Sequence, residues 1–290
     1  MRLLFKIISA KRVLKSVSFF ISGFIAVSIL VFACSAFAES KKGIKLPIIM
    51  YHSILKDESR QGEYVLSPVE LESDMLYLKE HGYTPILCQD LISYVYMDEE
   101  LPEKPIILSF DDGCYNNVQY VIPLLSKYNM KAVFGVVGTF CDKATEENKP
   151  NPNYSYMSWN DCKEAYISGR VEIACHSDNF HTLGQRTGAK KMESESYDDY
   201  RAVFMSDTLN FLNKIKTNSE IIPNTYVYPY GAISEESLQL VKACGFKVSL
   251  GVEEKQNYIT KDKECLYRLN RYNRPSGIST EEFMKRALDL

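Results

Sequence analysis

Two pairs of side chains in this sequence could hold a metal ion and activate a water molecule beside it. Asp111 and Asp112 are adjacent and directly follow the apolar run "IILSF", and His176 and His181 follow another, "VEIAC". Neighbouring carboxylates repel each other when both are ionised in a partly buried place, and a metal ion or a shared proton is the usual compensation. One aspartate and two histidines are a common ligand set for a catalytic divalent metal with an open water position. One aspartate of the pair would then bind the metal, and the other would stay free as a base.

The elements that must position these side chains alternate between strands and helices along the chain. Near-continuous apolar runs predict buried strands at 46–51, 83–87, 104–110, 131–137, 171–175, 225–228 and 246–252. Helical patterns are predicted at 67–82, 89–96, 158–169, 196–217, 234–245 and 279–288, with a further helix ending near residue 128. Such alternation is typical of parallel βα units, and seven or eight units without a linker-like break favour an α/β fold with one barrel over an open sheet.

Local signals differ in strength between these segments. The helix at 67–82 has Ser67 as a cap, Pro68 in its first turn, Glu70 to complete a capping box and Gly82 as a stop. The segment 141–157 is polar and contains two prolines. We expect it to form a loop over the strand ends that shapes substrate access.

The residues that could do chemistry lie at the carboxyl ends of predicted strands. His52 follows 46–51, the aspartates follow 104–110, the two histidines follow 171–175, and "YPYG" (228–231) ends 225–228. Each feature alone has an ordinary explanation, as a hydrogen-bonded structural histidine, a turn with a helix cap, or loop residues. Chemistry gathers at the carboxyl ends of parallel strands in barrels and open sheets alike, so their coincidence at one face favours a functional site.

The N-terminal residues have the pattern of an export signal. Residues 1–16 carry five positive charges and no acid, and residues 17–38 carry no charge and end in "AFA". We expect a signal peptide cut after Ala38, with an uncleaved membrane anchor through 17–38 or acylation of Cys34 as the alternatives. All three place the remainder outside the cytoplasm. We divide that remainder into a linker (39–45) and a single domain (46–290).

Charge and cysteine content narrow the range of partners. Removal of the five positive charges of residues 1–38 takes the formal net charge from −3 to −8. An acidic exported product is a poor candidate for binding nucleic acid, and it gains nothing from attraction to an anionic polymer. Seven irregularly spaced cysteines remain without a CxxC pair, which disfavours a cysteine zinc cluster. A neutral polymer, such as a polysaccharide, stays compatible with this charge, and we expect the protein to be a monomer.

Three motifs together resemble those of a known family. "SFDDG" (109–113), "HSDNFH" (176–181) and "YPYG" (228–231) resemble, in order and approximate spacing, the motifs of the polysaccharide deacetylases, the NodB-homology carbohydrate esterases of family 4. The resemblance covers about residues 46–290. "IMYHSI" (49–54) and the five-residue step between the two histidines are most similar to the branch with the poly-N-acetylglucosamine deacetylases.

The resemblance implies a fold, a reaction and roles for individual residues. It implies a distorted (β/α)7 TIM-like barrel that removes acetyl groups from N-acetylated sugars with a divalent metal, zinc by default and cobalt, nickel or iron as alternatives. Carried over by position, Asp111 is the general base, and the metal ligands are Asp112, His176 and His181. Tyr230 would offer its backbone N–H to the oxyanion.

The sequence departs from the family pattern at two points. Many members carry an arginine that orients the base two residues before the proline of the third motif, where this chain has Val227. Arg268, Arg271 or Arg274 could substitute, and spacing does not choose among them. Many members also supply a late histidine as general acid, but no histidine follows His181. We therefore assign this role to His52, because the resemblance to the branch named above implies an early histidine as general acid.

The substrate polymer and the bond cleaved stay open in the sequence. Peptidoglycan of the cell wall, chitin-like oligomers and an exopolysaccharide all fit the resemblance. The alternatives are an O-acetyl (xylan-type) esterase on the same scaffold and a non-catalytic sugar-binding relative. An unrelated phosphotransfer enzyme would leave the two histidines without a role.

Several further side chains lie near the motifs in the sequence. The aromatic residues Tyr115, Tyr154, Tyr156 and Trp159 are candidates for stacking on sugar rings, with ordinary packing as the alternative for each. Cys175 directly precedes a predicted ligand, but strand alternation should turn its side chain the other way.

Overall fold

The computed structural model describes residues 43–290. The predicted signal segment at 1–38 and residues 39–42 of the predicted linker lie outside the described residues. Lys45–Leu290 forms one compact unit. In the part of the chain that the structure describes, no helix is both long enough and apolar enough to cross a membrane.

Parallel strands form the centre of this unit. The strands are β2 (Ile48–Tyr51), β5 (Thr84–Pro85), β6 (Pro105–Phe110), β7 (Ala132–Val136), β8 (Val171–Cys175), β9 (Thr225–Val227), β10 (Val248–Leu250) and β12 (Tyr272–Asn273). Their order is β10-β9-β8-β7-β6-β2-β12, and β5 pairs with β6 outside this path. The pairings along the sheet are parallel, as the alternating pattern predicts.

The segment that contains β12 joins the two edges of the sheet. Leu269 forms a parallel bridge with Leu250 of β10, and Tyr272 pairs with Ile49 of β2. The Leu269 N–H donates to the Ser249 carbonyl at 2.8 Å. Because one segment contacts both edges, the sheet curls into the predicted distorted (β/α)7 barrel instead of staying open.

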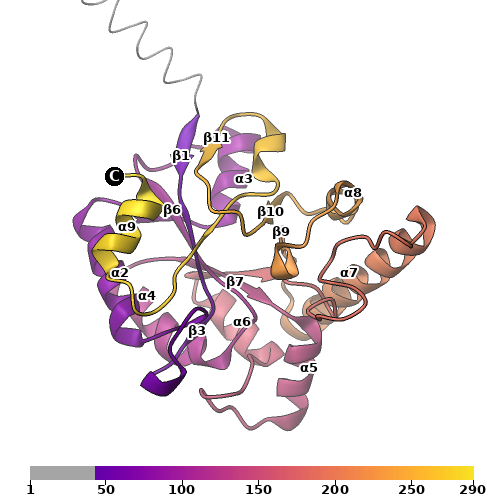
Figure 1. The fold of residues 1–290 in the computed structure, drawn as a ribbon, viewed down its shortest axis with the longest axis horizontal. Coiled ribbons are helices and arrows are strands. Elements are labelled where there is room, and N and C mark those ends of the chain that lie inside the picture. Colours follow the sequence, from indigo (N-terminus) through magenta and orange to yellow (C-terminus); the bar gives the residue numbers. More distant parts are fainter. Residues whose placement is uncertain (1–42) are drawn as a thin grey trace, which may run out of the picture. The chain divides into compact units, whose positions relative to one another are not determined.

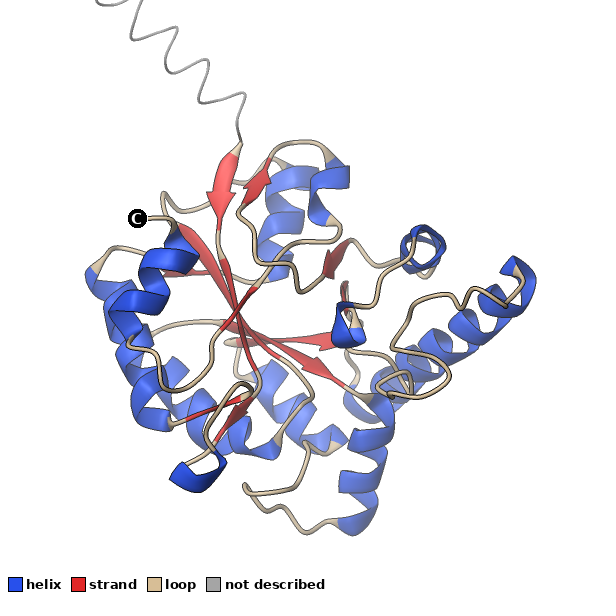
Figure 2. Ribbon diagram, viewed as in Figure 1, coloured by secondary structure: helices blue, strands red, loops and turns tan. Residues whose placement is uncertain are grey.

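Helices surround the strands (Figures 1 and 2). They are α2 (Pro68–Glu80), α3 (Cys88–Met97), α4 (Ile122–Tyr128), α5 (Gly138–Glu147), α6 (Trp159–Ile167), α7 (Tyr197–Ser219), α8 (Glu235–Ala243) and α9 (Thr280–Leu288). Helix α2 begins with the predicted capping box, in which Ser67 accepts from the N–H of Glu70 and Glu70 accepts from the N–H of Ser67. Helices α2, α4 and α9 lie side by side on one flank of the barrel (Figure 1).

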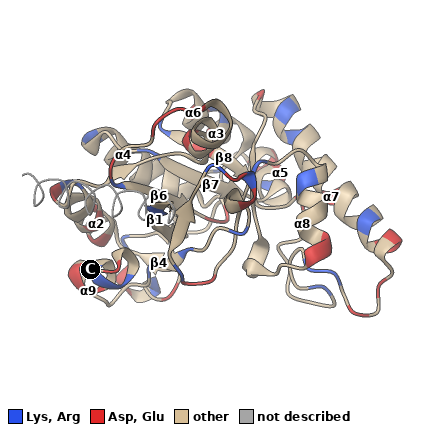
Figure 3. Ribbon diagram, turned by 90° about the horizontal axis from the view of Figure 1, so that it is seen from above, with Lys and Arg blue, Asp and Glu red and all other residues tan. Residues whose placement is uncertain are grey.

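Shorter elements connect these units. They are β1 (Ile44–Leu46), β3 (Ser53–Ile54), β4 (Val65–Leu66), β11 (Asn257–Ile259), the 3-10 turns Glu58–Arg60, Pro229–Gly231 and Lys263–Leu266, and the π-helical turn Asn117–Val121. Both signs of charge are interspersed over the outer helices, including α7 (Figure 3). This distribution is that of a solvated helix surface and presents no single-sign stripe along α7.

Strand alternation divides the side chains between the barrel interior and the layer under the helices. Ile106, Leu108 and Phe110 of β6 belong to the apolar cluster that also contains the buried faces of the helices. Ser109, which lies between them, is buried outside that cluster. The same alternation places Cys175 in the cluster, so the expectation that its side chain turns away from its neighbour His176 is confirmed.

One expectation about a loop is wrong in its first part. Residues 141–147 belong to α5, which begins at Gly138, and only residues 148–157 form a loop before α6. The sequence "GTFCDKATEE" is polar enough to resemble a loop, but its one-sided apolar positions, Phe140, Cys141 and Ala144, allow it to pack as a short helix. The helix begins at Gly138, where a β-carbon would collide with the carboxylate of Asp178.

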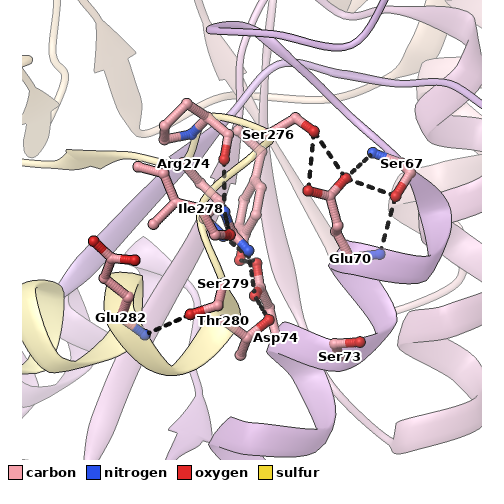
Figure 4. Close-up of polar contacts among 12 residues, drawn as sticks. Ser67, Glu70, Ser73, Asp74, Arg274, Ser276, Ile278, Ser279, Thr280 and Glu282 are labelled. Carbon is pink, nitrogen blue, oxygen red and sulfur yellow. Dashed lines mark hydrogen bonds and ion pairs between the residues drawn. The ribbon is translucent and has the colours of Figure 1, made fainter. Parts of the chain in front are cut away.

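A buried ion pair anchors the C-terminal segment on α2 (Figure 4). Arg274 donates from Nε to Asp74 Oδ2 at 2.8 Å and from Nη2 to Oδ1 at 3.1 Å. Tyr51 and Thr280 donate their hydroxyl protons to the same carboxylate. The remaining Arg274 nitrogen donates to the carbonyls of Pro275 and Ile278. The pair therefore joins β2, α2 and the turn before α9 at one buried point.

Candidate active site

The strand register brings the predicted motifs to one end of the barrel. Tyr51 pairs with Phe110 at the ends of β2 and β6, so His52 and Asp111 follow neighbouring strands. The Asp111 N–H donates to the Tyr51 carbonyl at 2.9 Å. On the other side of β7, Cys175 at the end of β8 pairs with Tyr226 of β9. The carboxyl ends of these strands therefore form one site, as parallel βα folds require.

Asp112, His176 and His181 form a cluster that could hold a metal ion. One potential ligand atom from each residue lies within 4.8 Å of the other two. Asp112 Oδ1 lies 3.0 Å from Nε2 of His181 and 3.5 Å from Nε2 of His176. Among the described residues, this oxygen is buried without a hydrogen-bond partner of good geometry. A carboxylate oxygen and two imidazole nitrogens that converge in this way fit a divalent cation.

The other ring nitrogen of each histidine has its own neighbour. His176 Nδ1 lies 2.8 Å from the carbonyl of Val227, and His181 Nδ1 lies 3.2 Å from the hydroxyl of Tyr230. These neighbours leave Nε2 of both rings directed at Asp112, which is the usual arrangement when an outer partner fixes a metal-binding imidazole. Val227, at the position where the resemblance implies an arginine, thus contributes its backbone carbonyl to the site.

Histidine neighbours also keep Asp112 ionised. Burial raises the pKa of the Asp112 carboxyl, but interactions with His176 and His181 more than offset this effect and hold the pKa well below its usual range. The residue adopts a left-handed backbone conformation with φ of 70°. That conformation is uncommon for a residue with a side chain and is found where surrounding structure enforces it, often at functional sites.

Arg271 is the arginine that contacts Asp111. It donates from Nη1 to Oδ1 at 2.7 Å and from Nη2 to Oδ2 at 2.8 Å, and both side chains are buried. Its Nε donates to the Gly251 carbonyl and its Nη1 also to the Ser109 hydroxyl. Burial raises the pKa of Asp111, but the charges of Arg271 and His176 lower it by a larger amount. The net shift is therefore downward, and the carboxylate stays ionised.

The two other candidate arginines have different partners. Arg268 forms a bidentate pair with Glu235 at the surface, and Arg274 binds Asp74. The sequence left the choice among three arginines open because all three lie in the short stretch "RLNRYNR" (268–274). The position of each along the segment that closes the barrel decides which one faces Asp111.

His52 lies beside the two carboxylates under an aromatic ring. Tyr64 packs edge-on against its imidazole with ring centroids 4.8 Å apart, and Asn117 donates to its backbone carbonyl. Its Nδ1 is buried without a partner among the described residues. Burial lowers the pKa of His52 from its ordinary value, while the Asp111 and Asp112 charges oppose this shift. The side chain is therefore placed for proton transfer at this face, and its role as an acid stays a prediction.

Tyr230 also lies at the cluster. Its ring centroid is 4.6 Å from that of His181, and its backbone is left-handed with φ of 56°. The predicted contribution of its backbone N–H to an oxyanion site stays a prediction. The Tyr230 side chain packs on the imidazole of His181, and Tyr230 remains 40% exposed to solvent.

Asp207 supports the loop between the two histidines and was missed in the sequence. From α7 it accepts the N–H groups of Asp178 and Asn179 at 3.0 and 2.7 Å. Ser177, with φ of 74°, accepts the N–H of Phe180 in the same loop. The available signal was an acid at helical spacing within the apolar face of α7, which carries Tyr200, Phe204 and Phe211. An acid on a buried face needs donors, and loop N–H groups supply them.

Three of the four candidate aromatic residues, Tyr154, Tyr156 and Trp159, divide into two groups. Trp159 is buried and donates from its indole nitrogen to Asp142, so it packs in the fold instead of facing a groove. Tyr154 is 73% exposed. Tyr156 stacks on Phe140 with ring centroids 4.2 Å apart. Tyr154 and Tyr156 therefore remain available to a ligand, whereas Trp159 does not.

Comparison with known proteins identifies the family. Residues 98–249 match the family model described as polysaccharide deacetylase. The chain belongs to the polysaccharide deacetylase family. The match covers the Asp-Asp-Gly, histidine and Pro-Tyr motifs of this deacetylase. It therefore contains the aspartate pair, His176, His181 and Tyr230.

Individual relatives agree with this family. The chain is 27% identical over 249 residues to YxkH of Bacillus subtilis (strain 168), a protein named as a polysaccharide deacetylase, and the match covers 86% of this chain and 78% of that one. It is 22% identical to the poly-beta-1,6-N-acetyl-D-glucosamine N-deacetylase of Escherichia coli (strain K12), over 71% of this chain and 33% of the relative. The match to the enzyme of that name from Staphylococcus aureus (strain MRSA252) is 26% identical and covers 66% and 62% of the two chains. The chain thus matches only a third of the Escherichia coli enzyme's length.

Solved structures share the fold of this deacetylase. A de-N-acetylase from Aggregatibacter actinomycetemcomitans superposes with a TM-score of 0.67 at 26% identity, covering 82% of this chain and 96% of that one. IcaB from Ammonifex degensii superposes with a TM-score of 0.67 at 19% identity, covering 85% and 97%. The second likeness bears on the fold alone.

Proposed function

We propose that this chain is an exported, metal-dependent N-deacetylase that hydrolyses the acetamide groups of N-acetylglucosamine polymers to a free amine and acetate. The observation that carries the proposal is that the two adjacent aspartates have different partners. Asp112 faces two imidazoles, whereas Asp111 is held by Arg271. A protein that only bound sugar or metal would not require a second buried carboxylate held ionised beside the cluster.

Asp112, His176 and His181 are proposed to hold the metal. Two imidazole nitrogens and one carboxylate oxygen are a donor set that suits zinc, with cobalt, nickel and iron as the alternatives. When bound, such a metal supplies Lewis acidity and lowers the pKa of a water molecule. Val227 and Tyr230 orient the two imidazoles from outside.

The remaining side chains are proposed to move protons and stabilise charge. Asp111, ionised and oriented by Arg271, accepts a proton from the attacking water. His52 donates a proton to the departing amine. The backbone N–H of Tyr230 donates to the oxygen that becomes negatively charged, a contribution typically of about 3 kcal/mol. Balance is kept because one proton is accepted and one is donated in each turnover.

The proposal extends to domain organisation and location. We assign 1–38 to a signal peptide or anchor, 39–45 to a linker and 46–290 to the deacetylase domain. The relatives from Escherichia coli and Staphylococcus aureus are named for the N-deacetylation of poly-beta-1,6-N-acetyl-D-glucosamine. Their names support a polysaccharide of this class as substrate, and the charge pattern of residues 1–38 supports export.

Acetate release tests the proposal directly. The chain from residue 39 onwards, which retains the whole compact unit, is loaded with zinc or cobalt and mixed with poly-N-acetylglucosamine, chitin oligomers and acetylated xylan. We expect acetate from the N-acetyl substrates. Asp111→Asn should abolish this release, whereas Asp198→Asn, at an exposed position at the start of α7, should not.

The other outcomes are equally informative. Acetate from xylan alone would replace the proposal with the O-acetyl esterase. Oligosaccharide binding without acetate from any substrate, in a chain with metal bound, would indicate a sugar-binding relative. Acetate release that survives Asp111→Asn would show that another group serves as the base.

A further inference from the structure

The loop between the two predicted histidine ligands contains a buried carboxylate that the proposed reaction does not use. Asp178 lies between His176 and His181 in the sequence, and its side chain is only 8% exposed. Its carboxylate accepts from Nζ of Lys214, at 2.7 Å to Oδ1 and 2.9 Å to Oδ2. A buried carboxylate needs such a partner, because removal of its charge from water is costly. Lys214 is thus paired with the loop that carries both predicted ligands.

Lys214 also joins this loop to helix α5. From its position on α7, its Nζ lies 2.7 Å from Oδ2 of Asp142 on α5. The other oxygen of Asp142 accepts the indole N–H of Trp159 at 2.8 Å, so this carboxylate is held on both sides. Among the described residues, no other lysine or arginine forms an ion pair with Asp142 or Asp178. One ammonium group therefore compensates both carboxylates.

The histidine loop lies directly on the first turn of α5. The N–H of Gly138 donates to the Ser177 carbonyl at 3.0 Å, and the N–H of Thr139 donates to the Asp178 carbonyl at 2.9 Å. A β-carbon on Gly138 would lie 2.1 Å from Oδ1 of Asp178, so the loop is already at its closest approach to this turn. The backbone and the side chain of Asp178 both contact α5, and a displacement of that side chain would therefore move the loop.

We propose that Lys214 is a positioning residue for the metal site, which holds Asp178 so that the loop keeps both histidine side chains at the spacing a divalent cation requires. This inference rests on the metal-binding role of the two histidines in the proposed function. Asp142 and Asp178 each lie within 2.7 Å of one nitrogen, so loss of Lys214 leaves two neighbouring like charges that repel each other. The repulsion displaces the loop more readily than α5, because the carboxylate of α5 keeps its indole partner.

Metal affinity, measured without substrate, tests this inference. The zinc dissociation constants of the parent chain and its variants are determined by competition with a chromophoric chelator, and the visible absorption of bound Co²⁺ reports the ligand geometry. Lys214→Met should weaken zinc binding about 10- to 100-fold, the effect expected when a group that orients metal ligands is lost, and should change the cobalt spectrum. Lys214→Arg keeps the charge between the two carboxylates and should restore most of the affinity and the parent spectrum.

Lys163→Met is the matched control. Lys163 of α6 pairs with Glu220 at 2.6 Å, and its side chain is 33% exposed, close to the 30% of Lys214. Its partner follows the C-terminal end of α7 and does not belong to the histidine loop. Loss of this surface pair should have at most a small effect on urea unfolding and should leave the zinc affinity and the cobalt spectrum unchanged.

Failure of this inference differs from failure of the proposed function. Parent-like zinc affinity in Lys214→Met, or equal losses in Lys214→Met and Lys163→Met, would overturn the positioning role while acetate release stands. If Lys214→Met does not fold, Asp178→Asn is measured in its place, because it removes the ion pair and nearly keeps the side-chain shape. Weaker zinc binding in that variant would support the inference, and parent-like binding would refute it. A parent chain that binds zinc and releases no acetate would overturn the proposed function alone.

Discussion

Arg271 and Arg274 lie on either side of β12, and each forms a bidentate pair with a buried aspartate. Arg271 binds Asp111 at the carboxyl end of the barrel strands, and Arg274 binds Asp74 between α2 and the C-terminal segment. The net pKa shifts of the two carboxyls are opposite. Burial raises both, but charges lower the pKa of Asp111 overall, whereas the pKa of Asp74 stays raised despite Arg274.

The difference between the pairs follows from what else surrounds each carboxylate. Histidines and a second carboxylate adjoin Asp111, so its charge is available to a reaction. Hydroxyl groups of Tyr51 and Thr280 enclose Asp74, so its oxygens are fully used within the fold. The same ion-pair chemistry therefore orients a carboxylate of the candidate active site at one end of β12 and attaches the C-terminal segment at the other.

The largest expected effect separates the two aspartates by activity. Asp111→Asn should lower kcat/KM for acetate release by about 10²–10⁴-fold, because an amide cannot accept a proton as a general base. The amide is close in shape to the carboxylate, so the variant should remain folded and keep its metal. Metal content and near-ultraviolet circular dichroism check that, and a variant with full activity would remove Asp111 from the role of base.

Asp74→Ala should have the opposite profile, a large loss of stability with activity per folded molecule retained. Removal of one partner from a buried pair leaves Arg274 uncompensated, which typically costs about 3–5 kcal/mol. Urea unfolding measures this loss, and rates below the transition are normalised to the folded fraction. A stable Asp74→Ala protein with impaired kcat would instead connect this pair to the active site, through Tyr51 and the neighbouring His52.

Arginine-to-lysine substitutions sharpen the comparison within one chemistry. Lysine keeps the charge but cannot reproduce two parallel hydrogen bonds. Arg271→Lys should lower kcat about 10- to 100-fold, because Asp111 would no longer be held in one orientation. Loss of an outer hydrogen-bond partner has an effect of this size on the ligands of metal sites. Arg274→Lys should change the unfolding midpoint and leave kcat alone. Equal kcat losses in both variants would mean that the two pairs act as one unit.

The pH dependence of activity should report the protonation of Asp111 and His52 and should not depend on the Arg274–Asp74 pair. Below the lowered pKa of Asp111 the base is protonated, and activity is lost in acid. Above the pKa of His52, which burial lowers from 6.5, the proposed acid is deprotonated, so kcat/KM should decline on the alkaline side from a point below 6.5. His52→Ala should remove the alkaline limb, and Arg274→Lys should retain both limbs. An alkaline limb that persists in His52→Ala would assign the donated proton elsewhere.

The smallest expected effect concerns Asp207, a buried acid that binds loop N–H groups without a guanidinium. Burial raises its pKa to about 6 from an ordinary 3.8, so its favourable contribution to stability is complete below 3.8 and is lost as pH rises through 6. Asp207→Asn should therefore destabilise the protein more at pH 4.5 than at pH 7.5, by about 1–3 kcal/mol at most. Unfolding at the two pH values measures this, and an equal loss at both would show that Asp207 is already ionised in acid.

The sequence by itself determined the repeating elements and the chemical types at the strand ends. Apolar runs and a capping box such as Ser67–Glu70 act within a few residues, so they specify β6 or α2 without knowledge of distant contacts. The site around Asp112, His176 and His181 could be predicted because the carboxyl ends of parallel strands lie at one end of the barrel, whatever the distance between the strands in sequence. Helix α5 could not be recognised because its sequence is polar enough to resemble a loop, and strand β12 could not be recognised because it has only 2 residues.

Only the tertiary structure decided which arginine serves which aspartate. Arg271 and Asp111 are 160 residues apart, and Arg274 and Asp74 are 200 apart. Both contacts exist because segment 269–273 closes the ring between β10 and β2. The three arginines of "RLNRYNR" are the same residue type in one short stretch, so the local sequence does not distinguish them. Only the direction in which each side chain leaves that segment does. Direction is a property of the closed barrel, which depends on contacts that no local stretch of sequence contains.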